Sequence, residues 1–166
     1  MRKRTRFLTH AAMIAALYAA LTHLQNLLLA GSASMAIQFR ASEALCVLAF
    51  FTPAAIPGLA IGCLVFNITF AGALPLDWVV GTLASLLAAA GMYLCRDRKL
   101  LRYPALLLPA AFNALLVGWE LAVYIGGGFW LNALYVAIGE AAVLLTLGVA
   151  LDATLRSSRL GQRLFV

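Results

Sequence analysis

Two glutamates stand inside strongly apolar stretches of this 166-residue chain. Glu120 falls in a predicted membrane span over residues 103–124, and Glu140 falls near the middle of the next predicted span, 130–153. An ionisable side chain inside a membrane is costly, and such residues usually face a cavity or the interior of the bundle. We therefore interpret Glu120 and Glu140 as candidate ligand-binding residues. A hydrogen bond from helix to helix is the alternative role for each.

Asparagines accompany both glutamates. Asn113 precedes Glu120 by seven residues, and Asn132 precedes Glu140 by eight residues. These spacings put each pair on nearly the same helical face. Asn67, in an earlier span, supplies a third amide. Amide and carboxylate groups together suit a polar ligand with several hydrogen-bonding atoms.

Two tryptophans lie close to these polar positions. Trp119 directly precedes Glu120, and Trp130 begins the last predicted span. A flat ligand could stack on either ring. The alternative is a belt of aromatic rings at the membrane–water interface, which needs no ligand.

Two short apolar segments, separated by a break, follow Gln38 and Arg40. Glu43 lies near the start of the first segment. The apolar run of about 12 residues over 41–52, which holds the predicted helix 41–51, reaches roughly 18 Å at about 1.5 Å per residue, whereas a bilayer core is about 30 Å thick. A Thr-Pro break separates it from a second helix over 54–70. Short, interrupted segments are typical of binding sites in transporters. Arg40 and Glu43 are therefore expected either to line a pocket or to pair with each other.

The composition is that of an integral membrane protein. Hydrophobic residues make up 64% of the chain and charged residues 11%, well below the roughly 25% charged residues of soluble domains. We expect a single all-α transmembrane domain over 1–166, with a short second helix. The six predicted spans are 7–29, 41–51, 54–70, 76–95, 103–124 and 130–153.

The positive charges predict the orientation of these spans. With six crossings, eleven of the twelve Lys and Arg residues fall on one side of the membrane. The positive-inside rule then places both termini in the cytoplasm. Arg40 is the exception, on the outer side. Because the cations follow the membrane boundaries, nucleic-acid binding is not expected.

Small residues form two stripes along the first span. Spacing of four residues places each stripe on one side of the helix, where another helix can approach closely. That neighbour could belong to the same chain or to a partner subunit. The stripes are Ala11, Ala15 and Ala19, and the adjacent Ala12, Ala16 and Ala20.

Enzyme and metal signatures are missing from the sequence. It contains no GxSxG, HExxH, GxGxxG or GxxxxGK[ST] motif, and its three cysteines have no metal-ligand spacing. We expect neither catalysis nor a cofactor.

The segment IQFRASEALCVLAFFTPAAIPGLAIGC resembles the QueT family, which consists of substrate-binding S components of energy-coupling factor (ECF) transporters. The tetrapeptide GWEL around Glu120 and the tripeptide GEA around Glu140 support the resemblance. The likeness implies six membrane helices in a bacterial plasma membrane. It also implies capture of a queuosine precursor outside the cell, with a transmembrane T subunit and two cytoplasmic ATPases as partners.

The resemblance further implies roles for individual residues. An alanine stripe of the first span, either that of Ala11 or that of Ala12, is expected to dock the T subunit. A 7-deazaguanine presents a ring N–H beside an amino group, which one carboxylate can accept together. Its aminomethyl form, preQ1, adds a cation for a second carboxylate. Which of Glu120 and Glu140 takes which role stays open.

Three other functions compete with this interpretation. The chain could be an S component for another vitamin-like solute. It could be a stand-alone, proton-coupled permease with Glu120 or Glu140 as the relay, although the inverted repeat of such permeases is not evident. It could also be a membrane enzyme, for which no catalytic constellation is visible.

Overall fold

The computed structural model describes residues 2–29 and 39–158, and within these residues all regular structure is helical. This confirms the predicted all-α class. Most elements are α-helices, η1 is a 3₁₀-helix, and η2 is a π-helical turn. In chain order they are α1 (Arg2–Leu28), η1 (Ala41–Phe50), α2 (Ala55–Thr69), α3 (Asp77–Cys95), α4 (Lys99–Ala105), α5 (Leu108–Tyr124), α6 (Phe129–Val143), η2 (Leu144–Gly148) and α7 (Val149–Ser157).

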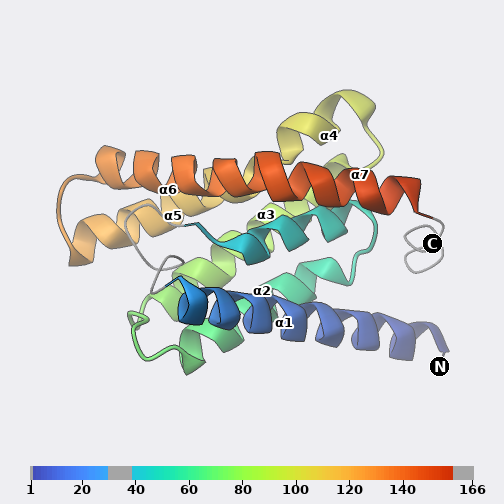
Figure 1. The fold of residues 1–166 in the computed structure, drawn as a ribbon, viewed down its shortest axis with the longest axis horizontal. Coiled ribbons are helices and arrows are strands. Elements are labelled where there is room, and N and C mark those ends of the chain that lie inside the picture. The colour runs from blue at the N-terminus through green and yellow to red at the C-terminus, as the bar shows by residue number, and fades with distance from the viewer. Residues whose placement is uncertain (1, 30–38, 159–166) are drawn as a thin grey trace.

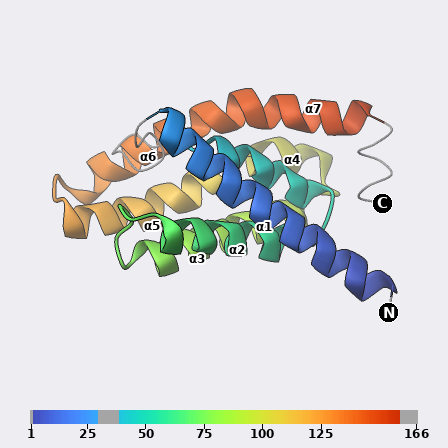
Figure 2. The same cartoon turned by 60° about the horizontal axis from the view of Figure 1, so that its bottom comes forward.

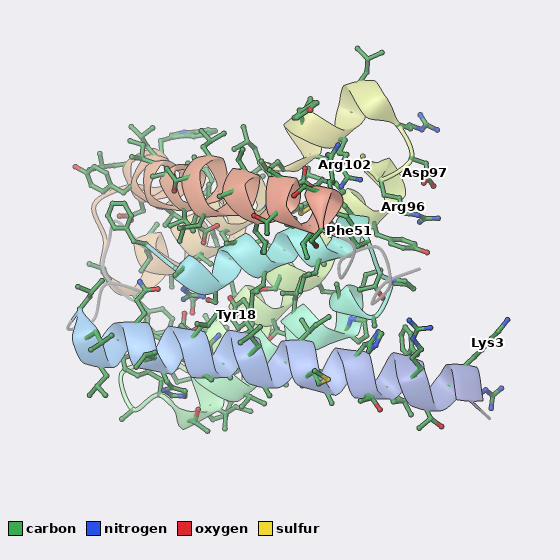
Figure 3. All side chains as sticks on the ribbon, turned by 45° about the vertical axis from the view of Figure 1, so that its right-hand side comes forward. Lys3, Tyr18, Phe51, Arg96, Asp97 and Arg102 are labelled. Carbon is green, nitrogen blue, oxygen red and sulfur yellow. The ribbon has the colours of Figure 1, made fainter. Side chains whose placement is uncertain are left out.

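The longer helices run back and forth along the long axis of the molecule (Figures 1 and 2). The start of α1, helix α4 and the end of α7 share one end, which we call the charged end. The opposite end carries the turns over 70–76 and 125–128, and we call it the loop end (Figure 1). Lys3, Arg96, Asp97 and Arg102 all lie toward the charged end (Figure 3).

Four helical stretches are long and apolar enough to cross a membrane, and two further apolar helices, η1 and α2, are shorter. Many large apolar side chains on the outside of the bundle are exposed, as expected for a surface that meets lipid. The four stretches are Lys3–Leu28, Asp77–Cys95, Leu100–Tyr124 and Phe129–Ser157.

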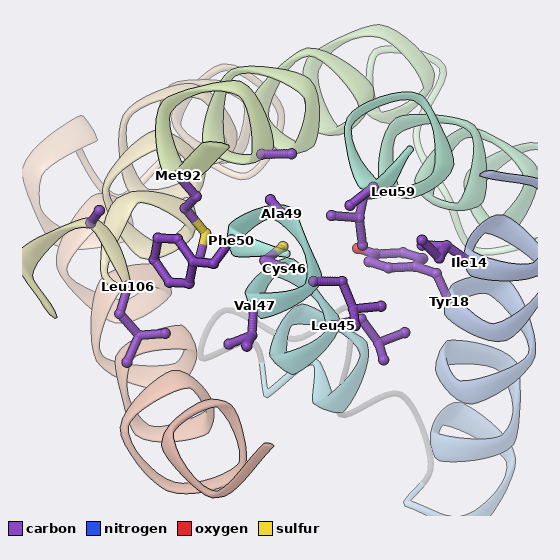
Figure 4. Packing of buried hydrophobic residues seen from close by; sticks show 14 of the residues in the cluster. Ile14, Tyr18, Leu45, Cys46, Val47, Ala49, Phe50, Leu59, Met92 and Leu106 are labelled. Carbon is purple, nitrogen blue, oxygen red and sulfur yellow. The ribbon is translucent and has the colours of Figure 1, made fainter. Parts of the chain in front are cut away.

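Helix η1 occupies the centre of the bundle, and every residue from Ser42 to Phe50 is buried. Its side chains point outward in all directions against α1, α2, α3 and the α4 region (Figure 4). The predicted short second helix is present, but it is a 3₁₀-helix, whereas its predicted length assumed the rise of an α-helix. Because the segment is apolar on every side, its pattern does not distinguish 3₁₀ from α. At about 2.0 Å per residue, its 10 residues reach roughly 20 Å.

Glycines of α2 explain how α1 lies against it. A Cβ atom on Gly58 would lie 2.9 Å from the carbonyl oxygen of Ala11, and one on Gly62 would lie 2.9 Å from that of Ala15. Only glycine permits so close an approach of the two backbones. The stripe of Ala11, Ala15 and Ala19 is therefore buried within this chain, whereas Ala12, Ala16 and Ala20 are exposed.

The last two predicted spans are both interrupted. The span expected over 103–124 begins earlier, at Lys99, as helix α4. A break then separates α4 from α5, whose first turn holds Pro109. Proline fits the first turn because its missing N–H is not needed there. The span expected over 130–153 continues through η2 into α7. Such π-helical turns often mark functional sites.

Arg102 ties these segments together at the charged end. Its guanidinium forms a salt bridge with Asp152 at 2.8 Å and lies 4.4 Å from the ring centroid of Phe50. Asp152 also pairs with Arg156 at 2.6 Å. Both side chains of the Arg102–Asp152 pair are mostly buried, so α4, α7 and the end of η1 are held together where the core meets the surface.

Candidate functional site

Glu140 and Asn113 meet inside the bundle. The side-chain amide of Asn113, on α5, donates a hydrogen bond to Oε2 of Glu140, on α6, over 2.8 Å. Glu140 is fully buried and Asn113 is 1% exposed. Among the described residues, neither Oε1 of Glu140 nor Oδ1 of Asn113 has a hydrogen-bond partner. The pair therefore presents two buried acceptor atoms that remain available for a ligand.

Glu120 is also fully buried, two turns of α5 beyond Asn113. Neither of its carboxylate oxygens has a hydrogen-bond partner within the described part of the chain. The carboxyl group of Asp77 and the charge of Arg40 both act electrostatically on it. A buried polar group without a partner costs free energy of about 1–3 kcal/mol, and more when it is charged. Its two unpartnered oxygens make Glu120 a candidate ligand contact.

A cavity of about 240 Å³ opens at the loop end, and its wall includes the residue that follows Glu120 on α5. This is slightly smaller than the roughly 300–1,000 Å³ typical of pockets for drug-sized ligands. Leu121, the next residue along α5, forms part of the wall. The full lining is Arg40, Gly72, Leu74, Asp77, Leu121, Tyr124 and Ile125.

Arg40 is 4% exposed although it lies at the loop end. Burial by itself would lower the pKa of Arg40, but the acidic groups around it, with Tyr18 and Glu43 among them, raise that pKa above its ordinary value. Arg40 therefore remains a cation. Its charge acts on both Glu120 and Glu140, which brings three of the predicted site residues into one electrostatic cluster.

Glu43, near the start of η1, contacts Tyr18 of α1. Its Oε1 accepts a hydrogen bond from the hydroxyl of Tyr18, and its Oε2 accepts one from the thiol of Cys46 at 3.2 Å. Beside this contact, the hydroxyl of Thr22 donates to that of Ser42 at 2.7 Å. Both oxygens of Glu43 are thus satisfied within the chain, so its contacts hold η1 against α1.

Two of the predicted amides support the loop end. Asn67 donates to the carbonyl of Asp77 at 2.8 Å, and Asn132 donates to the carbonyl of Gly126 at 2.8 Å. Gly126 belongs to a run of three glycines with positive φ, a conformation that side chains rarely adopt. These amides fix the turns that frame the cavity.

The tryptophans do not join this cluster. Trp119 is 50% exposed and Trp130 is 79% exposed, on the outer faces of α5 and α6. Such positions match the interfacial belt that the sequence left as an alternative. Gln38 lies outside the described residues.

Three polar residues contribute to the interior or to the cavity wall although the sequence did not predict them as site residues. Asp77 opens α3, lines the cavity and accepts a hydrogen bond from the N–H of Leu74 at 2.6 Å. Tyr18 holds Glu43, and Ser85 is buried with a hydroxyl that has no partner in the described part of the chain. A tyrosine hydroxyl amid the apolar residues of α1 was the one visible signal. Ser85 and Asp77 required the fold.

Comparison with known proteins places the molecule in a family. No curated protein and no solved structure gives a match. The QueT transporter family matches over residues 8–157, which includes η1, both buried glutamates of α5 and α6, and nearly the whole chain. This apolar helical chain is therefore a membrane protein that belongs to the QueT transporter family.

Proposed function

We propose that the protein is the substrate-binding S component of an ECF transporter that imports a queuosine precursor, a 7-deazaguanine such as preQ1. Membership in a transporter family supports a role in uptake. The observation that carries the proposal is the buried pair Glu120 and Glu140, whose carboxylates retain three oxygens without partners among the described residues. Buried polar groups are normally hydrogen-bonded, and a polar ligand would supply the hydrogen bonds that these carboxylates lack.

A deazaguanine has the right groups to satisfy these oxygens. Its ring N–H and neighbouring amino group are hydrogen-bond donors on one edge, and the aminomethyl arm of preQ1 is a cation. Carboxylates accept both kinds of bond, and bonds to charged groups are the stronger ones. The arrangement is matched to a small donor-rich molecule.

The chain's partners follow from the same proposal. The exposed stripe of Ala12, Ala16 and Ala20 is available to the T subunit, whereas the stripe of Ala11 is already covered by α2. Small residues allow the close helix approach that such docking needs. Two ATPases bound to the T subunit would supply the energy, since the sequence carries no nucleotide-binding motif.

In this proposal η1 and α2 count as crossings, which makes six in a bacterial plasma membrane. The charged end, which holds the start of α1 and the end of α7, then faces the cytoplasm, and the loop end with its cavity faces outward. The sidedness of the Lys and Arg residues supports this orientation.

The direct test is ligand identification. The protein is purified in mild detergent from cells, its bound small molecules are extracted and identified by mass spectrometry, and preQ1 is then titrated into the emptied protein. We expect a 7-deazaguanine in the extract and saturable binding of preQ1. A different vitamin-like solute in the extract, with no binding of preQ1, would overturn the substrate assignment.

Uptake assays separate an ECF subunit from a permease. We expect radiolabelled preQ1 to enter vesicles only when the T subunit and ATPases are present with ATP. Uptake by this chain alone, collapsed by a protonophore, would instead establish a proton-coupled permease.

A further inference from the structure

The hydrogen bond between Asn113 and Glu140 determines what this pair can recognise. A carboxylate only accepts, so the amide nitrogen of Asn113 must face Glu140. That leaves the carbonyl oxygen of Asn113 and Oε1 of Glu140, both buried, as two acceptors. Two acceptors on a hydrogen-bonded pair of side chains complement a ligand edge that carries two donors. A guanine-type edge has this pattern, whereas an adenine-type edge pairs a donor with an acceptor.

The region around Glu120 contains a second acidic side chain, that of Asp77. Asp77 and Leu121 both line the cavity, and Glu120, which directly precedes Leu121, is buried with neither oxygen partnered in the described part of the chain. Two carboxyl groups in such proximity repel each other when both are charged. A cation between them would remove that repulsion and pair with both.

The charge balance of the interior points the same way. Among the described residues the protein buries three glutamates, Glu43, Glu120 and Glu140, but a single arginine, Arg40. Burial without a nearby cation disfavours the charged form of a carboxyl group, and a cation beside it favours that form. A ligand that brings a positive charge therefore completes this cluster better than a neutral one.

The two subsites lie a suitable distance apart. Asn113 and Glu120 are separated by seven residues of α5, which is roughly 10 Å along the helix axis. A fused bicyclic base with a one-carbon amine arm can reach from one to the other. A single small cation could not contact both subsites at once.

Building on the proposed function, we infer that Glu140 and Asn113 bind the donor–donor edge of a guanine-type base, and that Glu120 and Asp77 form a subsite for a primary ammonium group at the cavity. The structure thereby assigns distinct roles to the two glutamates and adds Asp77 to the site. Asp77 would set the preference for the aminomethyl ligand over neutral relatives.

Paired titrations test this assignment. Purified wild-type protein and the variants Glu140→Gln, Glu120→Gln and Asp77→Asn are each titrated with preQ1 and with preQ0, whose nitrile carries no charge. Loss of a bond to a charged group corresponds to roughly ten- to a hundredfold in affinity. We expect Glu140→Gln to weaken both ligands by that factor. Glu120→Gln and Asp77→Asn should weaken preQ1 by that factor and change preQ0 affinity less than threefold or so.

Asp77→Asn is the sharpest of these variants because asparagine can still accept the hydrogen bond from Leu74. Only the charge is removed. Asp97→Asn is the matched control, since the side chain of Asp97 is 80% exposed at the charged end. It should leave both affinities unchanged. Thermal unfolding of each variant in the same detergent separates loss of a contact from loss of the fold.

The outcomes distinguish the inference from the function beneath it. If wild-type protein binds neither preQ1 nor preQ0, the proposed function fails. If wild-type protein binds both and Asp77→Asn weakens them equally, or weakens neither, the ammonium subsite is wrong. If Glu140→Gln affects preQ1 alone, the two glutamates have the opposite roles.

Discussion

The hydroxyl of Tyr18 donates a hydrogen bond to Oε1 of Glu43, and both side chains are fully buried. This contact joins the middle of α1 to the start of η1. On α1, the exposed stripe of Ala12 lies on the face turned away from Tyr18; on η1, Arg40 stands at the cavity. Tyr18 and Glu43 thus connect α1, whose exposed face is proposed to dock the T subunit, with η1, which begins beside the candidate site.

Removing the hydroxyl of Tyr18 should destabilise the protein. Tyr18→Phe leaves Oε1 of Glu43 buried without its donor, which costs about 1–3 kcal/mol. We expect a lower midpoint of thermal unfolding in detergent and similar weakening of charged and neutral ligands, because η1 as a whole loosens. Tyr103→Phe is the control, since Tyr103 is 71% exposed. An unchanged midpoint for Tyr18→Phe would mean that this hydrogen bond does not hold η1.

Gly118 determines how closely α5 approaches α6. A Cβ atom there would lie 2.7 Å from the Cα of Ala133, a backbone atom that side-chain rotation cannot move. Gly118→Ala should therefore push the helices apart, separate Asn113 from Glu140, and cost about 1–3 kcal/mol of stability. The measurement is ligand affinity together with thermal unfolding.

The control for this substitution is Gly91→Ala. Its Cβ would meet only the flexible end of Leu108, at 2.8 Å, which can rotate away. It should leave affinity within about twofold of wild type, a negligible free-energy change. Equal behaviour of the two variants would contradict a specific role for the Gly118 contact.

The two alanine stripes should respond differently to bulk. Ala16→Trp places a large ring on the exposed stripe and should prevent close approach of the T subunit while the ligand still binds. Ala15→Trp should instead disrupt the fold, because Ala15 is 8% exposed and packs on Gly62. Co-purification with the T subunit and ligand titration read out the two effects. Leu17→Trp, on another exposed part of α1, is the control, and a complex that survives Ala16→Trp would rule out this stripe.

The orientation can be tested by labelling. In a Cys95→Ala background the remaining cysteines, Cys46 and Cys63, are buried. Asp97→Cys, at the charged end, should not react with an impermeant thiol reagent added to intact cells, whereas Ala71→Cys, at the loop end, should react. Permeabilised cells should label both. Labelling of Asp97→Cys in intact cells would contradict this orientation of the charged end.

The sequence by itself determined the class of the molecule and where its polar interior would come from. Uninterrupted apolar stretches require helices, because a backbone in lipid must satisfy its own hydrogen bonds. The helical pattern also identified Glu120, Glu140 and Asn113, since ionisable and amide groups in such stretches turn inward. The motifs around Arg40 and Glu43 indicated the family that the match over residues 8–157 bears out.

The tertiary structure decided which of these residues meet. Helical spacing shows that Asn113 and Glu120 share a face, but only the packing of α5 on α6 brings Asn113 to Glu140. The alternative pairing of Arg40 with Glu43 was equally open, and the fold satisfies Glu43 through Tyr18 and Cys46. Likewise, the two alanine stripes are equivalent in sequence. The glycines of α2 have no side chain, so α2 packs closely on the Ala11 stripe and leaves the Ala12 stripe exposed. Close approach therefore depends on small residues in both facing helices.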